Sequence, residues 1–425
     1  MRIKAVWKWL YVAFCGWLGA TAGRAQDYHF DHSISEPVLQ NYLSRAITMV
    51  SVLQDDLSQA RNKKGVDPHD NIRLIVNIRA KFIGRAIRIQ GNEKDLPMIL
   101  KNAKPFEEAI HQADPDIILE GGEFEVITPA VETLTVPPGV LAAFGQAVED
   151  RKFRYDQIIY PQGQAPHHEG EKKAVPDMSR VETQMWFYFL ATSFIDVGVE
   201  AIHFGQVGLM DHNDKAHVGW LNMLGKVREY AHVHARRHFV LCDAHEQKGG
   251  TVEDGRLLFD FHEKPLRIVE VAGHPFQGIL EVGYADSIYQ KSRGGITPSG
   301  WSCEHLPYLV EFDNFGGMVH DPAKPSKRPF IWGWDEITWL GLMTEKQRND
   351  WLSYAWNWLK KNDPEGHLEM PGSRVMFPGS GIEGPTWFWA NTRSAACPGG
   401  FNAEETIKKI WAEDRWGAGK TQPGI

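Results

Sequence analysis

Short apolar runs that end in acidic residues recur along the chain, and residues 306–317 show this pattern most clearly. Their sequence, LPYLVEFDNFGG, starts with an apolar run, continues with Glu311 and Asp313, and ends at two glycines. A continuous apolar run is typical of a parallel strand that is buried on both faces. Because side chains alternate along a strand, Glu311 and Asp313 are expected to point to the same face. In a (β/α)8 barrel, the carboxyl ends of such strands hold the catalytic groups.

Other segments of similar character predict further strands, and the segments between them predict helices. In the helical segments, apolar residues recur every three or four positions, and Thr344 and Gln347 form a capping box before one of them. The predicted strands are 74–78, 116–128, 157–160, 200–204, 238–246, 257–263, 277–282, 306–317, 330–336 and 367–372. The predicted helices are 39–53, 96–112, 137–148, 185–194, 220–231, 351–359 and 407–411.

This alternation predicts an α/β fold with parallel strands. Strands spread over residues 27–413 favour one domain, a (β/α)8 barrel of the TIM type, over a doubly wound sheet. No G-x-G-x-x-G follows the first predicted strand, so a Rossmann fold lacks its usual support. The helix predicted at 39–53 precedes the first strand and is expected as an extra N-terminal helix beside or under the barrel. Residues 414–425 are expected to form a flexible tail.

The first 25 residues have the pattern of a secretory signal peptide. Arg2, Lys4 and Lys8 make a basic start, residues 10–18 form a short apolar core, and small residues precede a cleavage point after Ala25. The apolar core is too short to span a bilayer. We therefore expect a secreted or periplasmic protein with no membrane span after cleavage.

Charge and cysteine content exclude several classes of protein. Removal of residues 1–25 would take away four cations and no acid, so the formal net charge would change from −8 to −12. An acidic chain argues against nucleic acid and anionic membranes as partners. Three cysteines would remain, too few for a disulfide scaffold. Cys242 lies in a predicted strand and is expected to be buried and free, whereas Cys303 and Cys397 lie in predicted loops and are expected to approach each other.

Acids, histidines and amides follow many of the predicted strands, and tryptophans lie near them. In a barrel these strand ends meet at one rim, and pockets that bind sugars combine flat apolar rings with hydrogen-bonding groups. The candidate catalytic residues are Glu311, Asp243, Asp335, Glu336 and Asp313. The candidate substrate-binding residues are His203, Gln206, His245, Asp260, His262, Asn314, Trp301, Trp334, Trp387 and Trp389.

An exported α/β barrel with acidic strand ends and tryptophans in loops resembles the (β/α)8-barrel glycoside hydrolases in general. The resemblance implies cleavage of a glycosidic bond in a poly- or oligosaccharide by a pair of carboxyl groups, without a cofactor or metal. An Asn-Glu pair follows the fourth strand in many retaining members, whereas this sequence has Gly205-Gln206 there. We expect Glu311 to be the proton donor, since its strand is the most apolar and should raise its pKa. Asp243 or Asp335 is expected to be the ionised partner.

Two other functions agree with the same pattern. Asp243 with His245 and Asp260 with His262 form two Asp-x-His pairs, which could hold a divalent metal in a metal-dependent barrel hydrolase. A barrel that binds glycans without cleaving them is the other possibility. The sequence indicates neither the sugar nor the oligomeric state.

Overall fold

The computed structural model describes residues 26–54, 65–161, 172–246, 248–317, 329–377 and 386–414. The expected signal peptide therefore lies outside the described residues, as does nearly all of the expected tail. No helix in the described ranges is long and apolar enough to cross a membrane.

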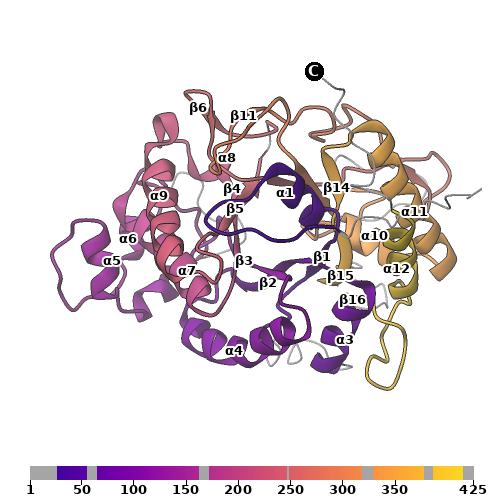
Figure 1. Cartoon of the computed structure of the whole chain (residues 1–425), viewed down its shortest axis with the longest axis horizontal. Helices are drawn as coiled ribbons and strands as arrows, with labels where there is room; N and C mark the ends of the chain where they lie inside the picture. Colours follow the sequence, from indigo (N-terminus) through magenta and orange to yellow (C-terminus); the bar gives the residue numbers. More distant parts are fainter. Residues whose placement is uncertain are drawn as a thin grey trace, which may run out of the picture.

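A mixed α/β fold is built around one large curled sheet of ten strands (Figure 1). Its order is β14-β13-β8-β5-β4-β3-β2-β1-β15-β16, and all neighbours are parallel except β15 and β16. The strands are β1 (Ala46–Met49), β2 (Phe82–Ile89), β3 (Ile118–Glu123), β4 (Ala201–Gln206), β5 (Leu241–His245), β8 (His262–Pro265), β13 (Tyr308–Glu311), β14 (Gly366–Leu368), β15 (Met370–Val375) and β16 (Trp387–Trp389).

Helices connect most of these strands and pack on the outside of the sheet (Figure 1). The longer ones are α3 (Pro68–Ile78), α4 (Leu96–Ala113), α7 (Val181–Asp196), α9 (Val218–His234), α11 (Glu345–Asn362) and α12 (Glu404–Glu413). Shorter ones are α5 (Pro138–Ala143), α6 (Tyr155–Ile158), α8 (Val207–Met210) and α10 (Glu336–Leu342). Between β8 and β13 the chain forms small strands instead: β9 (Val269–Glu270), β10 (Gly278–Ile279), β11 (Gly295–Ile296) and β12 (Ser302–Cys303). The last two join β6 (Val252–Glu253) and β7 (Arg256–Leu257) in a second sheet.

Apolar side chains and α1 (Glu36–Leu43) close one end of the curled sheet. Leu39, Tyr42 and Leu43 of this helix pack against residues at the start of the strands, and Figure 1 shows α1 over the middle of the sheet. Since these are the amino ends of the strands, their carboxyl ends lie at the opposite end. The residues of this apolar layer that lie at the strand starts, or just before one in the case of Phe261, are Ala46, Phe82, Ile118, Ala201, Leu241, Phe261 and Leu309.

Several sequence predictions of elements agree with the structure. Strands form within 200–204, 238–246, 306–317 and 367–372. The capping box at Thr344 is confirmed, since its hydroxyl accepts from the Gln347 backbone N–H and the Gln347 side chain binds back. The expected extra N-terminal helix is also present as α1. Cys242 is buried and free as predicted.

Other predictions were wrong for identifiable reasons. Residues 74–78 belong to helix α3, because Asp67 caps its start, Pro68 occupies its first turn and Arg79 ends it at φ 60°. The helix predicted at 39–53 stops at Leu43, and β1 follows between two neighbouring strands. The strand predicted at 157–160 is the end of helix α6 followed by one isolated bridge at Ile159, and 330–336 leads into α10. Cys303 and Cys397 are both free, so the expected disulfide is absent.

Candidate functional site

The layer above the apolar end of the sheet is polar. On each of six strands, the residue two positions beyond the apolar-layer residue points to the same face, because side chains alternate along a strand. These six residues are Gly84, Glu120, His203, Asp243, Glu263 and Glu311. All the side chains among them are at most 1 % exposed, so the sheet encloses a buried cluster of titratable groups.

Glu311 at the end of β13 stands at the centre of this cluster. Arg85 donates from Nη2 to its Oε1 at 2.5 Å, and Arg374 donates from Nη1 to its Oε2. His245 Nε2 lies 2.8 Å from Glu311 Oε1. Burial alone would raise the pKa of Glu311, but the charges of Arg374 and Arg85 and the hydrogen bond with His245 hold it well below its usual value. Glu311 is therefore ionised.

The neighbouring carboxyl groups behave in the opposite way. Burial raises the pKa of Glu120, Asp243 and Glu263 well above the usual range, and it raises the pKa of Glu369 to about 8. Repulsion between these acids adds to the effect, since Asp243 acts on Glu120 and Glu311 acts on Glu369. At neutral pH Glu311 is therefore charged while these four neighbouring carboxyl groups keep their protons.

His203 connects two of the protonated acids. Its Nδ1 lies 2.7 Å from Asp243 Oδ2 and 3.2 Å from Glu263 Oε2. Burial, followed by the charge of Arg85, lowers the pKa of His203 to about 3, so the ring is neutral. The two carboxyl groups thus share one ring nitrogen of a neutral imidazole, which adds no charge to the cluster.

Arg85 reaches the cluster from an irregular part of β2. The pairing register of β2 with β3 shifts between Ile83 and Ile87, and Arg85 lies inside this bulge at φ 57°. Bulges of this kind redirect a side chain. The Arg85 backbone N–H also donates to Glu120 Oε2 at 2.9 Å. The bulge thus fixes both the guanidinium beside Glu311 and the carboxyl of the next strand.

Asp313 and His245 lie at the accessible edge of the cluster. Arg374 donates from Nη2 to Asp313 Oδ1 at 2.7 Å, so one guanidinium holds both Glu311 and Asp313. The side chain of Asp313 is 17 % exposed and that of His245 is 11 % exposed, whereas Glu311 is fully buried. Asn314, which follows Asp313, is also partly exposed. A ligand that approaches Glu311 would meet these side chains first.

Asp260 and His262 point away from the cluster. They alternate with Phe261 of the apolar layer and Glu263 of the polar one, so they face the outside of the sheet. Asp260 accepts the Cys242 backbone N–H at 3.0 Å, and His262 Nε2 lies 3.0 Å from Ser292 Oγ. The four residues proposed from the sequence as one metal site therefore lie on two faces of the sheet.

Asp335 and Glu336 start helix α10 and are not part of the polar layer. Asp335 is the N-cap, since it accepts from the backbone N–H of Thr338 at 2.9 Å and of Gly316 at 3.0 Å. Glu336 binds Arg267 at 3.1 Å. Burial raises the pKa of Asp335 to about 7 and that of Glu336 to about 8. The hydrogen bonds of Asp335 indicate a structural role.

Most of the predicted sugar-binding side chains have other surroundings. Trp301 packs at the α1 end, where its Nε1 donates to the Ile34 carbonyl at 3.0 Å. Trp387 and Trp389 stack at 5.2 Å between centroids and are buried, as is Trp334. Trp334, Trp387 and Trp389 therefore leave little ring surface for a sugar to stack on.

Gln206 is the last residue of β4, and its side chain and backbone both bind Glu125. Its Nε2 donates to Glu125 Oε1 at 2.7 Å, and its backbone N–H donates to Glu125 Oε2 at 3.0 Å. Glu125 also contributes to the electrostatic field at His203. The Gln206 side chain is thus tied to the loop after β3 and lies near the cluster without belonging to it.

A pocket of about 190 Å³ lies beside the cluster, at the ends of β4 and β5. Glu246, the residue after β5, lines it, and burial raises the pKa of this carboxyl to about 7. His217 lies 2.5 Å from Glu253 and 3.4 Å from Asp211, and hydrogen bonds led by Asp211 raise its pKa to about 9. The pocket is therefore small and lined by acidic and basic side chains together, since Lys248 and Arg293 also face it.

No protein-family description matches this sequence, and none of the curated proteins compared with it matches either. Function therefore has to be argued from the geometry alone.

Five residues of the cluster were not among the sequence candidates: Arg85, Glu120, Glu263, Glu369 and Arg374. Glu120 and Glu263 follow the same two-residue spacing as Glu311, and this spacing could have identified them once the strands were placed. The positions of the two arginines depend on tertiary structure, since one lies in a bulge and the other on a strand that reaches the cluster from the far end of the chain.

Proposed function

We propose that this protein is a glycoside hydrolase whose acid and nucleophile are carboxyl groups in the polar layer of the curled sheet. The observation that carries the proposal is the ionised Glu311 among carboxyl groups that keep their protons at neutral pH. Carboxyl groups whose pKa values are pushed apart by their surroundings can act as base or nucleophile and as acid in one reaction. Glycosidic bonds are normally cleaved by such a pair.

We also propose that the curled sheet closes into a (β/α)8 barrel. β14 pairs with β13 at one end of the strand order, and β15 pairs with β1 towards the other. Glu369 alone separates β14 from β15, and its backbone N–H donates to Val310 O at 2.9 Å. Residues 366–375 would then act as the eighth strand and bring Glu369 and Arg374 beside Glu311.

In this proposal Glu311 is the nucleophile and Glu263 is the proton donor. Oxygen atoms of Glu263, Glu311 and Glu369 lie within 4.8 Å of one another, close to the ~5–5.5 Å separation of carboxyl groups in retaining enzymes. Arg85 contacts Glu311 at 2.5 Å and Glu263 at 3.3 Å, so it can stabilise the anion of either. The role of Glu311 is thus the reverse of the one expected from its apolar strand, because Arg85 and Arg374 outweigh the effect of burial.

The reaction would proceed in two steps. Glu311 attacks the anomeric carbon while the Glu263 carboxyl gives its proton to the leaving oxygen, so the glycosidic bond breaks and a glycosyl ester forms. The Glu263 carboxylate then takes a proton from water, and the resulting hydroxide cleaves the ester and releases Glu311. Asp313 and His245, at the accessible edge, would hydrogen-bond sugar hydroxyls. Export by residues 1–25 would agree with an extracellular glycan as the substrate.

A metal-dependent hydrolase is the second candidate, with different ligands from those proposed from the sequence. Ligand atoms of His203, His245 and Glu263 lie within 4.8 Å of one another, as a divalent ion would require. Arg85 opposes such a site, because its Nη2 lies 3.1 Å from His245 Nε2 and 3.3 Å from Glu263 Oε2. A guanidinium at this distance repels a cation, so we favour the carboxylate mechanism.

The test is to assay the purified mature protein on a panel of glycans and to measure new reducing ends. Glu311→Gln should reduce cleavage to background on every substrate. Glu263→Gln should lower turnover by about 10²–10⁴-fold on natural glycans and much less on aryl glycosides with good leaving groups. The control is Glu281→Gln, a change of an exposed glutamate, which should leave turnover unchanged.

Three outcomes would contradict the proposal. Near-normal activity of Glu311→Gln on natural glycans would remove Glu311 from the reaction. Loss of wild-type activity in a chelator, with recovery on adding metal, would favour the metal-dependent mechanism. Sugar binding without cleavage of any glycan would indicate a binding protein.

A further inference from the structure

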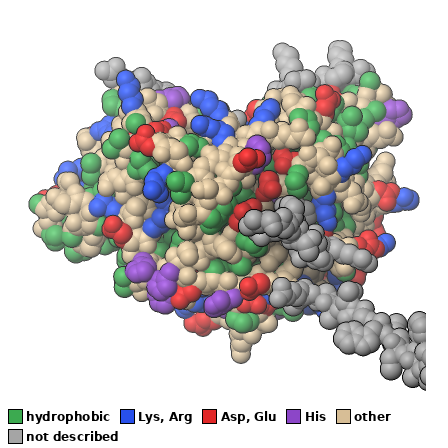
Figure 2. Space-filling view, turned by 45° about the horizontal axis from the view of Figure 1, so that its top comes forward, with side chains coloured by type: hydrophobic (Ala, Val, Ile, Leu, Met, Phe, Trp, Pro, Cys, Tyr) green, Lys and Arg blue, Asp and Glu red, His purple; other side chains and the backbone are tan. Residues whose placement is uncertain are grey.

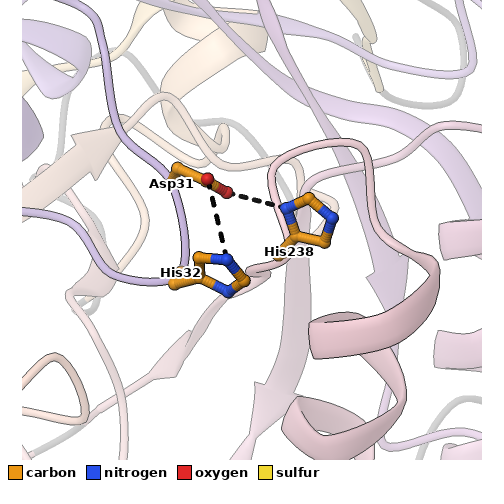
Figure 3. Close-up of side chains that lie close together, drawn as sticks. All are labelled: Asp31, His32 and His238. Carbon is orange, nitrogen blue, oxygen red and sulfur yellow. Dashed lines mark hydrogen bonds and ion pairs between the residues drawn. The ribbon is translucent and has the colours of Figure 1, made fainter.

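A group of histidines lies on the outside of the molecule, at the α1 end and far along the strands from Glu311. Figure 3 shows Asp31, His32 and His238 pointing toward one another. His238 Nδ1 lies 2.8 Å from Asp31 Oδ1, and His32 Nε2 lies 3.7 Å from Asp31 Oδ2. Figure 2 shows histidine side chains gathered at the lower left of the visible face. Neither the proposed hydrolysis nor the packing of the sheet uses these groups.

We propose that Asp31, His32 and His238 form a binding site for a divalent transition-metal ion of the zinc type. One ligand atom from each residue lies within 4.8 Å of the others. Around a tetrahedral ion bound at about 2.0–2.1 Å, neighbouring ligand atoms are about 3.3 Å apart. The distances of 2.8 and 3.7 Å lie on either side of this value, and side-chain rotations that separate the stacked His32 and His238 rings would complete the arrangement. Water would be the fourth ligand.

A fourth residue orients one of the ligands. His232, on helix α9, has its Nδ1 3.2 Å from Nδ1 of His32, which is the nitrogen that does not face Asp31. A histidine that binds metal through one ring nitrogen almost always hydrogen-bonds through the other, and this fixes its tautomer. His232 would accept the His32 Nδ1–H and leave Nε2 free for the ion.

The backbone holds the ligands in place before any ion binds. His32 and His238 both have positive φ, at 60° and 51°, a conformation that non-glycine residues adopt at a cost. The His32 backbone N–H donates to Arg237 O at 3.0 Å, and the Arg237 guanidinium binds the buried Glu200 at 2.9 Å. The two segments are thus locked together next to the metal ligands.

The site would have a structural role. It joins the N-terminal segment, which carries Phe30 and Ile34 of the apolar layer, to the loop before β5. The amino-terminal face of a barrel generally serves stability, whereas catalysis occurs at the opposite face. Zinc would therefore stabilise the folded chain without taking part in the reaction.

The experiment is equilibrium dialysis of the chelator-stripped mature protein against Zn²⁺, together with thermal unfolding with and without Zn²⁺. The wild type should bind zinc and unfold at a higher temperature when zinc is present. His32→Ala and His238→Ala should each weaken binding at least about tenfold and abolish this shift, because each removes one of three protein ligands. All the altered side chains are exposed, so these variants should fold, as circular dichroism can verify.

Two controls separate this site from others. His69→Ala changes another exposed histidine, which pairs with a single aspartate at 3.1 Å, and it should leave zinc binding intact. His245→Ala removes a ligand of the alternative catalytic metal site and should also leave this binding intact. The proposal is overturned if the wild type binds no zinc, or if His32→Ala and His238→Ala bind it as tightly as the wild type does.

Discussion

Arg85 and Arg374 determine which carboxyl of the cluster is charged. Each donates to a different oxygen of Glu311, so neither oxygen is free to keep a proton. Among the described residues, none of the other acids of the cluster is held by two guanidinium groups in this way. They remain protonated because burial penalises their anions. Removing one partner of a buried ion pair leaves the other charge uncompensated, which costs several kcal/mol. The two arginines therefore stabilise the strands that carry them and set the charge on which the proposed reaction depends.

At the scale of one residue, Gly84 tests how tightly this cluster is packed. A Cβ at this position would lie 1.9 Å from Glu369 Oε1 and 3.5 Å from Glu120 Oε2. Gly84→Ala should therefore destabilise the protein by about 1–3 kcal/mol, the usual cost of overpacking, and should lower activity by displacing Glu369. Denaturant unfolding measures the first effect and the glycan assay the second. Gly139→Ala is the matched control, since no atom lies within 4 Å of its added Cβ. Equal stability of the two variants would show that Glu369 moves freely.

At the scale of elements, the sequence was most informative where local signals agreed. Residues 306–317 predicted a strand because an apolar run is followed by acids and two glycines, and Thr344 predicted a helix start because its capping box is complete. Prediction failed at 74–78, where a run of β-branched residues was read as a strand although Asp67 and Pro68 start a helix there. It also failed at β1, whose four residues are a strand only because β2 and β15 pair with them.

In the candidate site, too, residues marked by a local sequence pattern could be predicted, whereas contacts between distant segments could not. Asp243, His203, His245 and Glu311 could be predicted, because each lies at the end of a recognisable strand. The contact of Arg374 with Glu311 joins residues 63 positions apart, and that of Arg85 joins residues 226 apart. No local pattern encodes such pairs, so the charge state of Glu311 could not be predicted.

Helix α11 provides a test at this scale. It packs against β14, and its start is fixed by the Thr344 hydroxyl and the Gln347 side chain. Thr344→Ala should lower the free energy of unfolding by about 1 kcal/mol, because it leaves a backbone N–H at the helix start without its partner. Thr344→Ser keeps the hydroxyl and should lose much less. Calorimetry of both variants measures the difference, and glycan cleavage should be unchanged in each. A loss as large in the serine variant would mean that the methyl group, and not the cap, matters.

For the whole molecule, the buried acids predict an unusual dependence of stability on pH. Burial raises the pKa of Glu336 and of Glu369 to about 8. Between the usual pKa of about 4.3 and about 8, these acids are ionised in the unfolded chain and protonated in the folded one. The folded state thus binds more protons in this range, so stability falls as pH rises. At lower pH, Glu404 makes stability fall as pH falls. Arg73 and its other hydrogen-bond partners outweigh burial and lower the pKa of Glu404 to about 2.

We therefore expect the melting temperature to be highest near about pH 5 and to decrease towards about pH 8. Scanning calorimetry across this range measures it. Glu336→Gln removes one of the responsible groups, so its melting temperature should decrease less over the same interval. A melting temperature that rises steadily from pH 5 to 8 would show that these acids are already ionised in the folded protein.

The position of α1 has a consequence for the order in which the chain can fold. Gln40 of this helix binds Glu365 and His367, which lie 325 and 327 residues further along the sequence. The helix also rests on the starts of seven strands, the last of which is β13. During synthesis or export from the amino end, α1 emerges before any of these surfaces exists. Its apolar face is covered in part by the earlier strands and completely only when β13 and β14 are in place, so the first helix made is among the last to complete its contacts.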